Sequence, residues 1–172
     1  MPEPVFITLG SNIDPHQNLR RAVQMIGQKF PIQAASRVYE TAPIDAAGNV
    51  DGSQAAFLNA AVLITTDKPP AEIKYKILRF LETMLGRVRT ADKFAARTID
   101  LDLALYGDRV IDSPRLVLPD PDILTRAHVA LPLADLAPDF RHPVTGQTLA
   151  AIAASFAGAG GITVRDDLPL LS

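Results

Sequence analysis

Residues 93–107 read KFAARTIDLDLALYG, and the second half of this stretch has the alternation of a β-strand that ends at Gly107. Successive side chains of a strand point to opposite faces, so Asp100 and Asp102 share one face, about 6.5–7 Å apart along the chain. The other face is apolar and can enter a core; it comprises Ile99, Leu101, Leu103 and Leu105.

Two aspartates on one face of a strand repel each other unless a cation lies between them. Mg²⁺ held by one or two carboxylates together with substrate phosphates meets this need. The segment just upstream is basic, with Arg87, Arg89, Lys93 and Arg97. Acidic groups for a metal beside basic groups for phosphates are typical of nucleotide-dependent phosphoryl transfer. A solvated edge strand beside an ordinary basic loop is the alternative reading.

The composition predicts a single globular domain spanning residues 1–172. Hydrophobic residues make up 48% of the chain, enough for a substantial core. The formal net charge of −2 argues against a nucleic-acid-binding protein, so the basic segment indicates a small anionic ligand. Cysteine is absent, which excludes disulfides and thiolate metal sites. No signal peptide or membrane-spanning run is recognisable, and we expect a cytoplasmic protein without a membrane partner.

The beginning of the chain predicts a buried strand at 5–9 that leads through Gly10-Ser11-Asn12 into a helix. Asp14 is the expected N-cap, Pro15 occupies the first helical position and the helix should end near Phe30. Further strands are expected at 32–41, 57–66, 110–111 and 162–164. A helix over 70–84 should be capped by Asp67, opened by Pro69 and Pro70 and ended by Gly86. One or two short helices are expected at 123–137 and a further helix at 148–156. Strands dispersed among helices predict an α+β sandwich with a mainly antiparallel sheet.

Two features of the middle of the chain have a possible role at a site. Residues 42–56 form a long irregular segment, which is either a flap over a substrate or a plain insertion. Glu82 falls in the last turn of the helix expected at 70–84, where the helix dipole disfavours an acid, and it either pairs with nearby arginines or is solvated. The expected core stripe of this helix is Ile73, Ile77, Phe80, Leu81 and Met84.

Five short motifs follow one another along the chain: LGSN at 9–12, ETAP at 40–43, FLNA at 57–60, LGRVR at 85–89 and RTIDLD at 97–102. Each is weak alone, but their order and spacing over residues 5–140 resemble the 6-hydroxymethyl-dihydropterin pyrophosphokinases of folate biosynthesis. The resemblance implies a ferredoxin-like three-layer sandwich with helices on both faces of the sheet. It also implies transfer of pyrophosphate from ATP to the pterin hydroxymethyl group, with release of AMP.

The resemblance further implies the roles of individual residues in a protein expected to be a monomer with small-molecule substrates. Asp100 and Asp102 would hold two Mg²⁺ ions that bridge the ATP phosphates. Arg87 and Arg97 would act with them as catalytic residues. ATP would be bound by Arg89, Leu103, Arg115 and Arg126. The pterin would be bound by Thr41, Ala42, Pro43, Ile44, Phe57, Asn59, Phe94 and His128.

The sequence departs from the family pattern at several of these positions. Phe94 stands where a tryptophan is common, and Asp120 stands where a histidine often contacts ATP. His128 replaces a phenylalanine that stacks on the pterin, and its protonation would make binding depend on pH. These departures motivate an alternative, a diverged paralogue that binds nucleotide or pterin with weak or no turnover. A nucleotidyltransferase is a further alternative, although its Gly-Ser turn and Asp-x-Asp strand are usually near neighbours in sequence.

Overall fold

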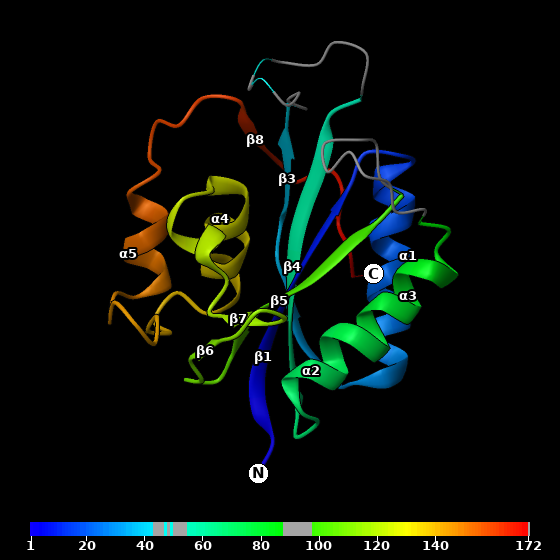
Figure 1. The fold of residues 1–172 in the computed structure, drawn as a ribbon. Coiled ribbons are helices and arrows are strands. Elements are labelled where there is room, and N and C mark those ends of the chain that lie inside the picture. Colours follow the sequence, from blue (N-terminus) through cyan, green and yellow to red (C-terminus); the bar gives the residue numbers. More distant parts are fainter. Residues whose placement is uncertain (43–46, 48, 50–54, 88–97, 172) are drawn as a thin grey trace.

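Strand β4, Phe57–Thr66, lies at the centre of a six-stranded sheet with the order β5-β1-β4-β3-β8, in which β2 also pairs with β4 (Figure 1). The structure is a computed structural model that describes residues 1–42, 47, 49, 55–87 and 98–171. The strand predicted at 57–66 is confirmed with both of its ends. The other strands of the sheet, all paired antiparallel, are β1 (Glu3–Ser11), β2 (Ile32–Ala35), β3 (Val38–Thr41), β5 (Asp100–Tyr106) and β8 (Ile162–Arg165).

Helices cover both faces of this sheet, so the predicted three-layer α+β sandwich is confirmed (Figure 1). One face carries α1 (Pro15–Lys29) and a helical stretch made of α2 (Pro70–Glu72), the π-helical segment η1 (Ile73–Leu78) and α3 (Arg79–Met84). The other face carries the 3₁₀ turn η2 (Pro121–Leu124), α4 (Ala127–Leu136) and α5 (Leu149–Ala154). A hairpin of β6 (Ile111–Asp112) and β7 (Val117–Leu118) connects β5 to η2.

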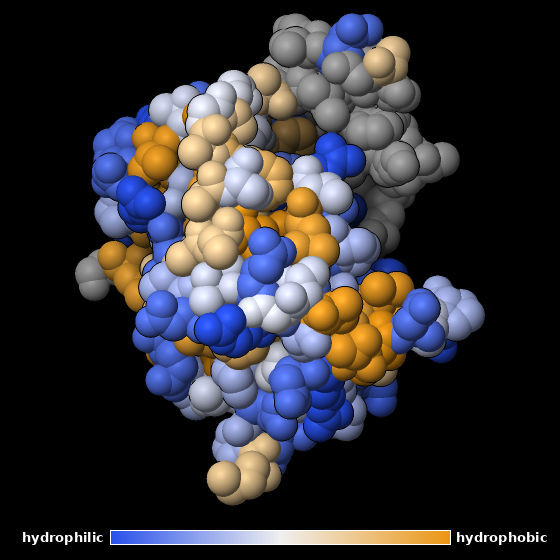
Figure 2. Space-filling view, turned by 90° about the vertical axis from the view of Figure 1, so that its left-hand side faces the viewer, coloured by the Kyte–Doolittle hydropathy of each residue, from blue (hydrophilic) through white to orange (hydrophobic). Residues whose placement is uncertain are grey.

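The alternation along β1 divides its side chains between two cores, and one of its two faces leads to the candidate site. Val5, Ile7 and Leu9 enter the core under α1 and α3. Phe6 enters the core under α4 and α5, where its ring meets that of Phe140 edge-on at 4.9 Å between centroids. Further along β1, this second face continues with Thr8 and Gly10, so it changes from apolar to polar beyond the cover of α4 and α5. The outer surface on the α4 and α5 side alternates hydrophilic and hydrophobic patches (Figure 2).

The π-helical segment changes which residues of the 70–84 helix face the core. The predicted stripe is partly wrong, because Phe80 and Met84 are 51% and 56% exposed. A π segment adds a residue to a helical turn and so rotates everything after it. The buried positions after Ile73 are therefore Leu78, Leu81 and Leu85, together with Glu82.

Three local predictions are wrong. Asp14 precedes α1 as expected, but it adopts a left-handed conformation with φ 40° and makes no side-chain cap, while Pro15 does occupy the first helical position. The strand expected at 32–41 is broken in two at Ser36, which pairs with Ala61 of β4 through its backbone N–H and again through its hydroxyl oxygen (2.9 and 2.8 Å). Asp67 does not cap the 70–84 helix, whose N-cap is Pro69.

The end of the chain packs on the domain. The edge strand predicted at 162–164 is confirmed as β8, which pairs with β3. The chain then returns toward α1, where the carbonyl of Pro169 lies 3.0 Å from Nε2 of His16, and Leu170 is buried in the α1 core. In the described part of the chain, no helix combines the length and apolarity needed to cross a bilayer.

Candidate active site

The two aspartates of β5 lie on the polar half of the sheet face described above. Asp100 is opposite Gly10 of β1, and Asp102 is opposite Thr8. Their side chains are 39% and 43% exposed, so both carboxylates are accessible from outside the protein. The prediction that they share a face is confirmed, because they lie opposite Gly10 and Thr8, two positions on the same face of β1.

Each aspartate has a cationic partner. Arg87 donates a hydrogen bond from Nη1 to Oδ1 of Asp100 at 2.6 Å. Nζ of Lys74 lies 3.5 Å from Oδ1 of Asp102, which also accepts a hydrogen bond from the backbone N–H of Leu103. Partial burial raises the pKa of Asp102 above its ordinary range, and the charge of Asp100 adds to this, although Lys74 opposes both effects. The arrangement thus leaves a carboxylate that gains from further positive charge.

Glu82 holds Arg87 in place beside Asp100 and also contacts the backbone of β5. Its side chain is almost fully buried, and Oε2 accepts hydrogen bonds from Nη1 of Arg87 (2.8 Å) and from the backbone N–H of Leu101 in β5 (2.9 Å). Burial lowers the pKa of Arg87, but Asp100 and Glu82 outweigh it and the net shift is upward. Sequence reasoning left open whether Glu82 pairs with an arginine. The structure shows that it does.

The polar face continues across β1 to the residues predicted to bind the pterin. Asn59 of β4 lies opposite Gly10, so this glycine stands between Asn59 and Asp100 on neighbouring strands. Nδ2 of Asn59 donates to Oγ1 of Thr41 (3.0 Å) and to the carbonyl of Tyr39 (3.2 Å). Phe57 is two residues from Asn59 on β4 and therefore lies on the same face.

The outer edge of β5 is bordered by Asp120, whose backbone N–H donates to the carbonyl of Ala104 (2.9 Å). Its carboxylate accepts a hydrogen bond from the N–H of Asp122 at the start of η2. Burial, together with the charge of Asp102, raises the pKa of Asp120 to about 6 despite that hydrogen bond. Asp120 therefore takes up its proton at a higher pH than an exposed aspartate does, but it is still mostly an anion at pH 7.

The remaining described candidates lie around this edge. Arg115 stacks on the ring of Tyr75 at 4.9 Å, and Nζ of Lys74, which also pairs with Asp102, lies 5.7 Å from the centroid of the same ring. Arg126 is exposed at the N-cap of α4. Burial and the charge of Arg126 lower the pKa of His128 in the first turn of that helix, so its ring is neutral at pH 7.

Not every candidate is placed by the structure in the way that sequence alone suggests. The side chain of Leu103 is buried in the α1 core, so only its backbone faces the candidate site. Ala42 is exposed after the end of β3. Five of the predicted residues lie outside the described part of the chain: Pro43, Ile44, Arg89, Phe94 and Arg97.

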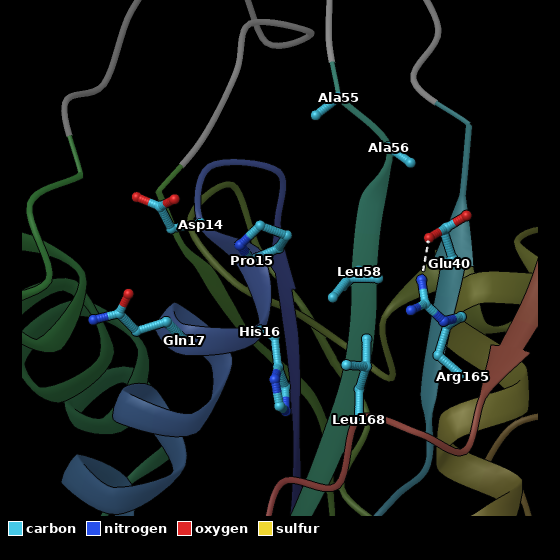
Figure 3. A pocket seen from close by; sticks show the side chains of 10 residues that line it. All are labelled: Asp14, Pro15, His16, Gln17, Glu40, Ala55, Ala56, Leu58, Arg165 and Leu168. Atoms are coloured by element: carbon cyan, nitrogen blue, oxygen red, sulfur yellow. Dashed lines mark hydrogen bonds and ion pairs between the residues drawn. The ribbon is translucent and has the colours of Figure 1, made fainter.

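A separate cavity of about 470 Å³ opens on the opposite face of the sheet (Figure 3). It lies between the start of α1 and the returning C-terminal segment, and the ion pair of Arg165 with Glu40 forms one of its walls. Glu40 is opposite Leu58 in the β3–β4 pairing, and Leu58 belongs to the α1 core. None of the ten residues that line this cavity is among the predicted site residues.

The aspartate pair fits Mg²⁺ better than a metal that needs a complete protein cage. Within the described residues, no three His, Asp or Glu side chains converge in a way that could hold a metal. Two accessible carboxylates supply only part of the oxygen ligands of a hard cation, so other ligands must complete its coordination shell. Phosphate oxygens and water are the usual additional ligands of Mg²⁺ in such sites.

A family model described as 7,8-dihydro-6-hydroxymethylpterin-pyrophosphokinase matches residues 6–138. A 2-amino-4-hydroxy-6-hydroxymethyldihydropteridine pyrophosphokinase of Pseudomonas aeruginosa is 34% identical over 147 residues, which are 83% of this chain and 86% of the relative. One from Bacillus subtilis is 37% identical over 134 residues, with 76% of each chain covered. The folic acid synthesis protein fol1 of Pneumocystis carinii is 35% identical over 151 residues, or 87% of this chain.

The chain spans only 20% of the Pneumocystis carinii protein, which is much longer. The wild-type HPPK-DHPS of Plasmodium falciparum has a similar fold, with a TM-score of 0.65, over 91% of this chain and 45% of the other, at 14% sequence identity. This structural likeness supports the ferredoxin-like fold.

Proposed function

The chain belongs to the 7,8-dihydro-6-hydroxymethylpterin-pyrophosphokinase family, and on that premise we propose that it transfers pyrophosphate from MgATP to 6-hydroxymethyl-7,8-dihydropterin in folate biosynthesis. The hydroxymethyl oxygen attacks the β-phosphorus of ATP, the bond from that phosphorus to the oxygen of the α-phosphate breaks, and AMP leaves. The hydroxyl proton is released. The acceptor and donor must therefore meet with these three atoms in line.

The observation that supports this proposal best is the row formed by Asn59, Gly10 and Asp100 on three adjacent strands. A glycine in the middle leaves the face open, because no side chain stands between the amide and the carboxylate. An acceptor heterocycle held at Asn59 and a phosphate donor held at the aspartates would thus lie side by side. Thr41 fixes the amide orientation of Asn59, which suits recognition of a heterocycle edge.

The donor side is built for a polyanion. Asp100 and Asp102 would hold Mg²⁺, two ions according to the family resemblance, and the metal would neutralise phosphate oxygens. Arg87 lies at the aspartate pair and is held there by Glu82, so its guanidinium needs little reorganisation as charge moves to the leaving group. Arg115 and Arg126 are proposed to bind ATP, as are Arg89 and the backbone at Leu103. Arg97 is proposed as a second catalytic arginine.

The acceptor side is proposed to comprise Thr41 to Ile44, Phe57, Asn59, Phe94 and His128. A neutral His128 can stack on a pterin without bringing charge into the pocket. Phe57 lies on the same face as Asn59 and is proposed to stack on the pterin ring as well.

The experiment is to incubate the protein with MgATP and the reduced hydroxymethyl pterin and to separate the nucleotides by chromatography. AMP together with a pyrophosphorylated pterin is the expected result. Release of inorganic pyrophosphate would instead indicate a nucleotidyltransferase, and binding of both substrates without any product would indicate a non-catalytic relative. A single domain over 1–172, a monomeric state and a cytoplasmic location stay predictions.

A further inference from the structure

Lys74 is a charged residue at the aspartate pair that the sequence reading did not single out. It lies in the π-helical segment Ile73–Leu78, which runs beside β5, and its Nζ is 3.5 Å from Oδ1 of Asp102. Its side chain is 26% exposed. Single-turn π segments inside helices occur frequently at functional sites. The position of Lys74 beside the carboxylates therefore indicates a role at the site and not only solvation at the surface.

The two cations at the pair differ in how firmly they are held. Arg87 is 10% exposed and is anchored to Glu82 as well as to Asp100. Lys74 is half-buried and reaches Asp102 by an ammonium at the end of a flexible four-carbon stem. The distance of 3.5 Å marks an ion pair without the short contact that Arg87 makes. Arg87 is thus a fixed part of the site, whereas Lys74 can leave Asp102 at little cost.

We propose that Lys74 is an exchangeable counter-ion of the metal site, which neutralises Asp102 in the free protein and moves to the phosphates of the nucleotide when MgATP binds. This inference rests on the proposed function. An ammonium beside a carboxylate ligand repels a bare divalent cation, so Lys74 weakens binding of the metal alone. A nucleotide brings several negative charges, which Lys74 can then contact through phosphate oxygens.

The consequence is a coupling between metal and nucleotide. Without Lys74, the carboxylates would attract divalent cations whether or not ATP is present. With Lys74 present, metal binding is favoured mainly when the nucleotide binds as well, because the phosphates attract the lysine away from Asp102. Such coupling is reciprocal, so any increase that Lys74 makes in the effect of the nucleotide on metal affinity is matched by an equal increase in the effect of the metal on nucleotide affinity.

The test uses Mn²⁺ as the probe and measures its binding to the full chain by electron paramagnetic resonance, with and without a non-hydrolysable ATP analogue. We compare wild type, Lys74→Met and Lys74→Arg. Lys76→Met is the matched control, since Lys76 is exposed in the same π-helical segment. In Lys74→Met we expect Mn²⁺ alone to bind on the order of ten-fold more tightly and the Mn²⁺–analogue complex to bind on the order of ten-fold more weakly. Lys74→Arg and Lys76→Met should follow wild type.

Unchanged or weaker binding of Mn²⁺ alone to Lys74→Met would overturn the proposal, as would an equal effect in Lys76→Met. Lys74→Gln provides a second neutral variant if Lys74→Met fails to fold. Turnover of the wild type with the pterin is assayed separately. Tighter Mn²⁺ binding in Lys74→Met with no turnover in the wild type would reject the proposed function and keep the role of Lys74. Normal turnover of the wild type with unchanged Mn²⁺ binding in Lys74→Met would support the proposed function and reject the role of Lys74.

Discussion

The buried carboxylate of Glu82 accepts a hydrogen bond from the backbone N–H of Leu101 at 2.9 Å, and so ties the end of α3 to the strand between the two aspartates. The same oxygen binds Arg87, which in turn reaches Asp100. One buried side chain therefore fixes a helix, a strand and a cationic group in relation to each other. A buried charge with charged and backbone partners is costly to disturb.

Glu82→Gln should destabilise the fold by about 1–3 kcal/mol and reduce turnover, because it removes the buried charge opposite Arg87. Glu72→Gln is the control, since Glu72 lies on the same helical stretch but is only half-buried. Urea unfolding measures the free energy and chromatography of AMP measures the rate. Equal stability of Glu82→Gln and Glu72→Gln would show that the Glu82 contacts contribute no net stability.

Asp100→Ala and Asp102→Ala should each lower turnover by at least 10²–10³-fold, an order-of-magnitude expectation for loss of a group that stabilises transition-state charge. Both side chains are about 40% exposed, so thermal unfolding should change little. Asp108→Ala, at an exposed turn after β5, is the control for removal of a surface aspartate. A near-normal rate in either site variant contradicts the metal assignment.

His128 should make stability depend on pH on the acidic side only. Its pKa is lowered from the ordinary 6.5 by burial and by Arg126, so the unfolded chain binds the proton more readily than the folded one. The contribution of His128 to stability is complete above about pH 6.5 and falls as the pH drops toward the lowered pKa. His128→Phe should therefore lose less stability than wild type between pH 7.5 and pH 5, as measured by urea unfolding. Parallel pH curves for the two proteins would contradict the assignment.

The returning C-terminal segment should contribute to the stability of the whole domain through Leu170. This side chain is 6% exposed in the α1 core, whereas its neighbour Leu171 is 52% exposed. Leu170→Ala should cost about 2–3 kcal/mol in the free energy of unfolding. Leu171→Ala should change it by less than about 0.5 kcal/mol. Similar values for the two variants would mean that the segment does not pack on the core in solution.

Much of the architecture follows from local patterns in the sequence. The apolar run 57–66 has no polar face, and it forms the central strand β4 with both ends as expected. The alternation around Asp100 and Asp102 predicted which face of β5 is polar. The five motifs identified the family, and a C-terminal edge strand was visible from its β-branched residues.

Other features depended on contacts between distant segments. Ser36 breaks the predicted strand because it pairs with Ala61, 25 residues away, and no local pattern marks that pairing. Asp14 lacks a capping bond because the turn before α1 takes a left-handed conformation.

By itself, the sequence determined the order of strands and helices, the shared face of the two aspartates and the family, because these depend on residue types at fixed short spacings. Only the tertiary structure decided that Glu82 is buried behind Arg87 and that Lys74 faces Asp102. The burial of Glu82 depends on an extra residue in one helical turn, which rotates the rest of the helix against β5, and the approach of Lys74 to Asp102 depends on how the π-helical segment packs beside that strand. The pattern of apolar residues assumes a regular helix, so it could not reveal that rotation.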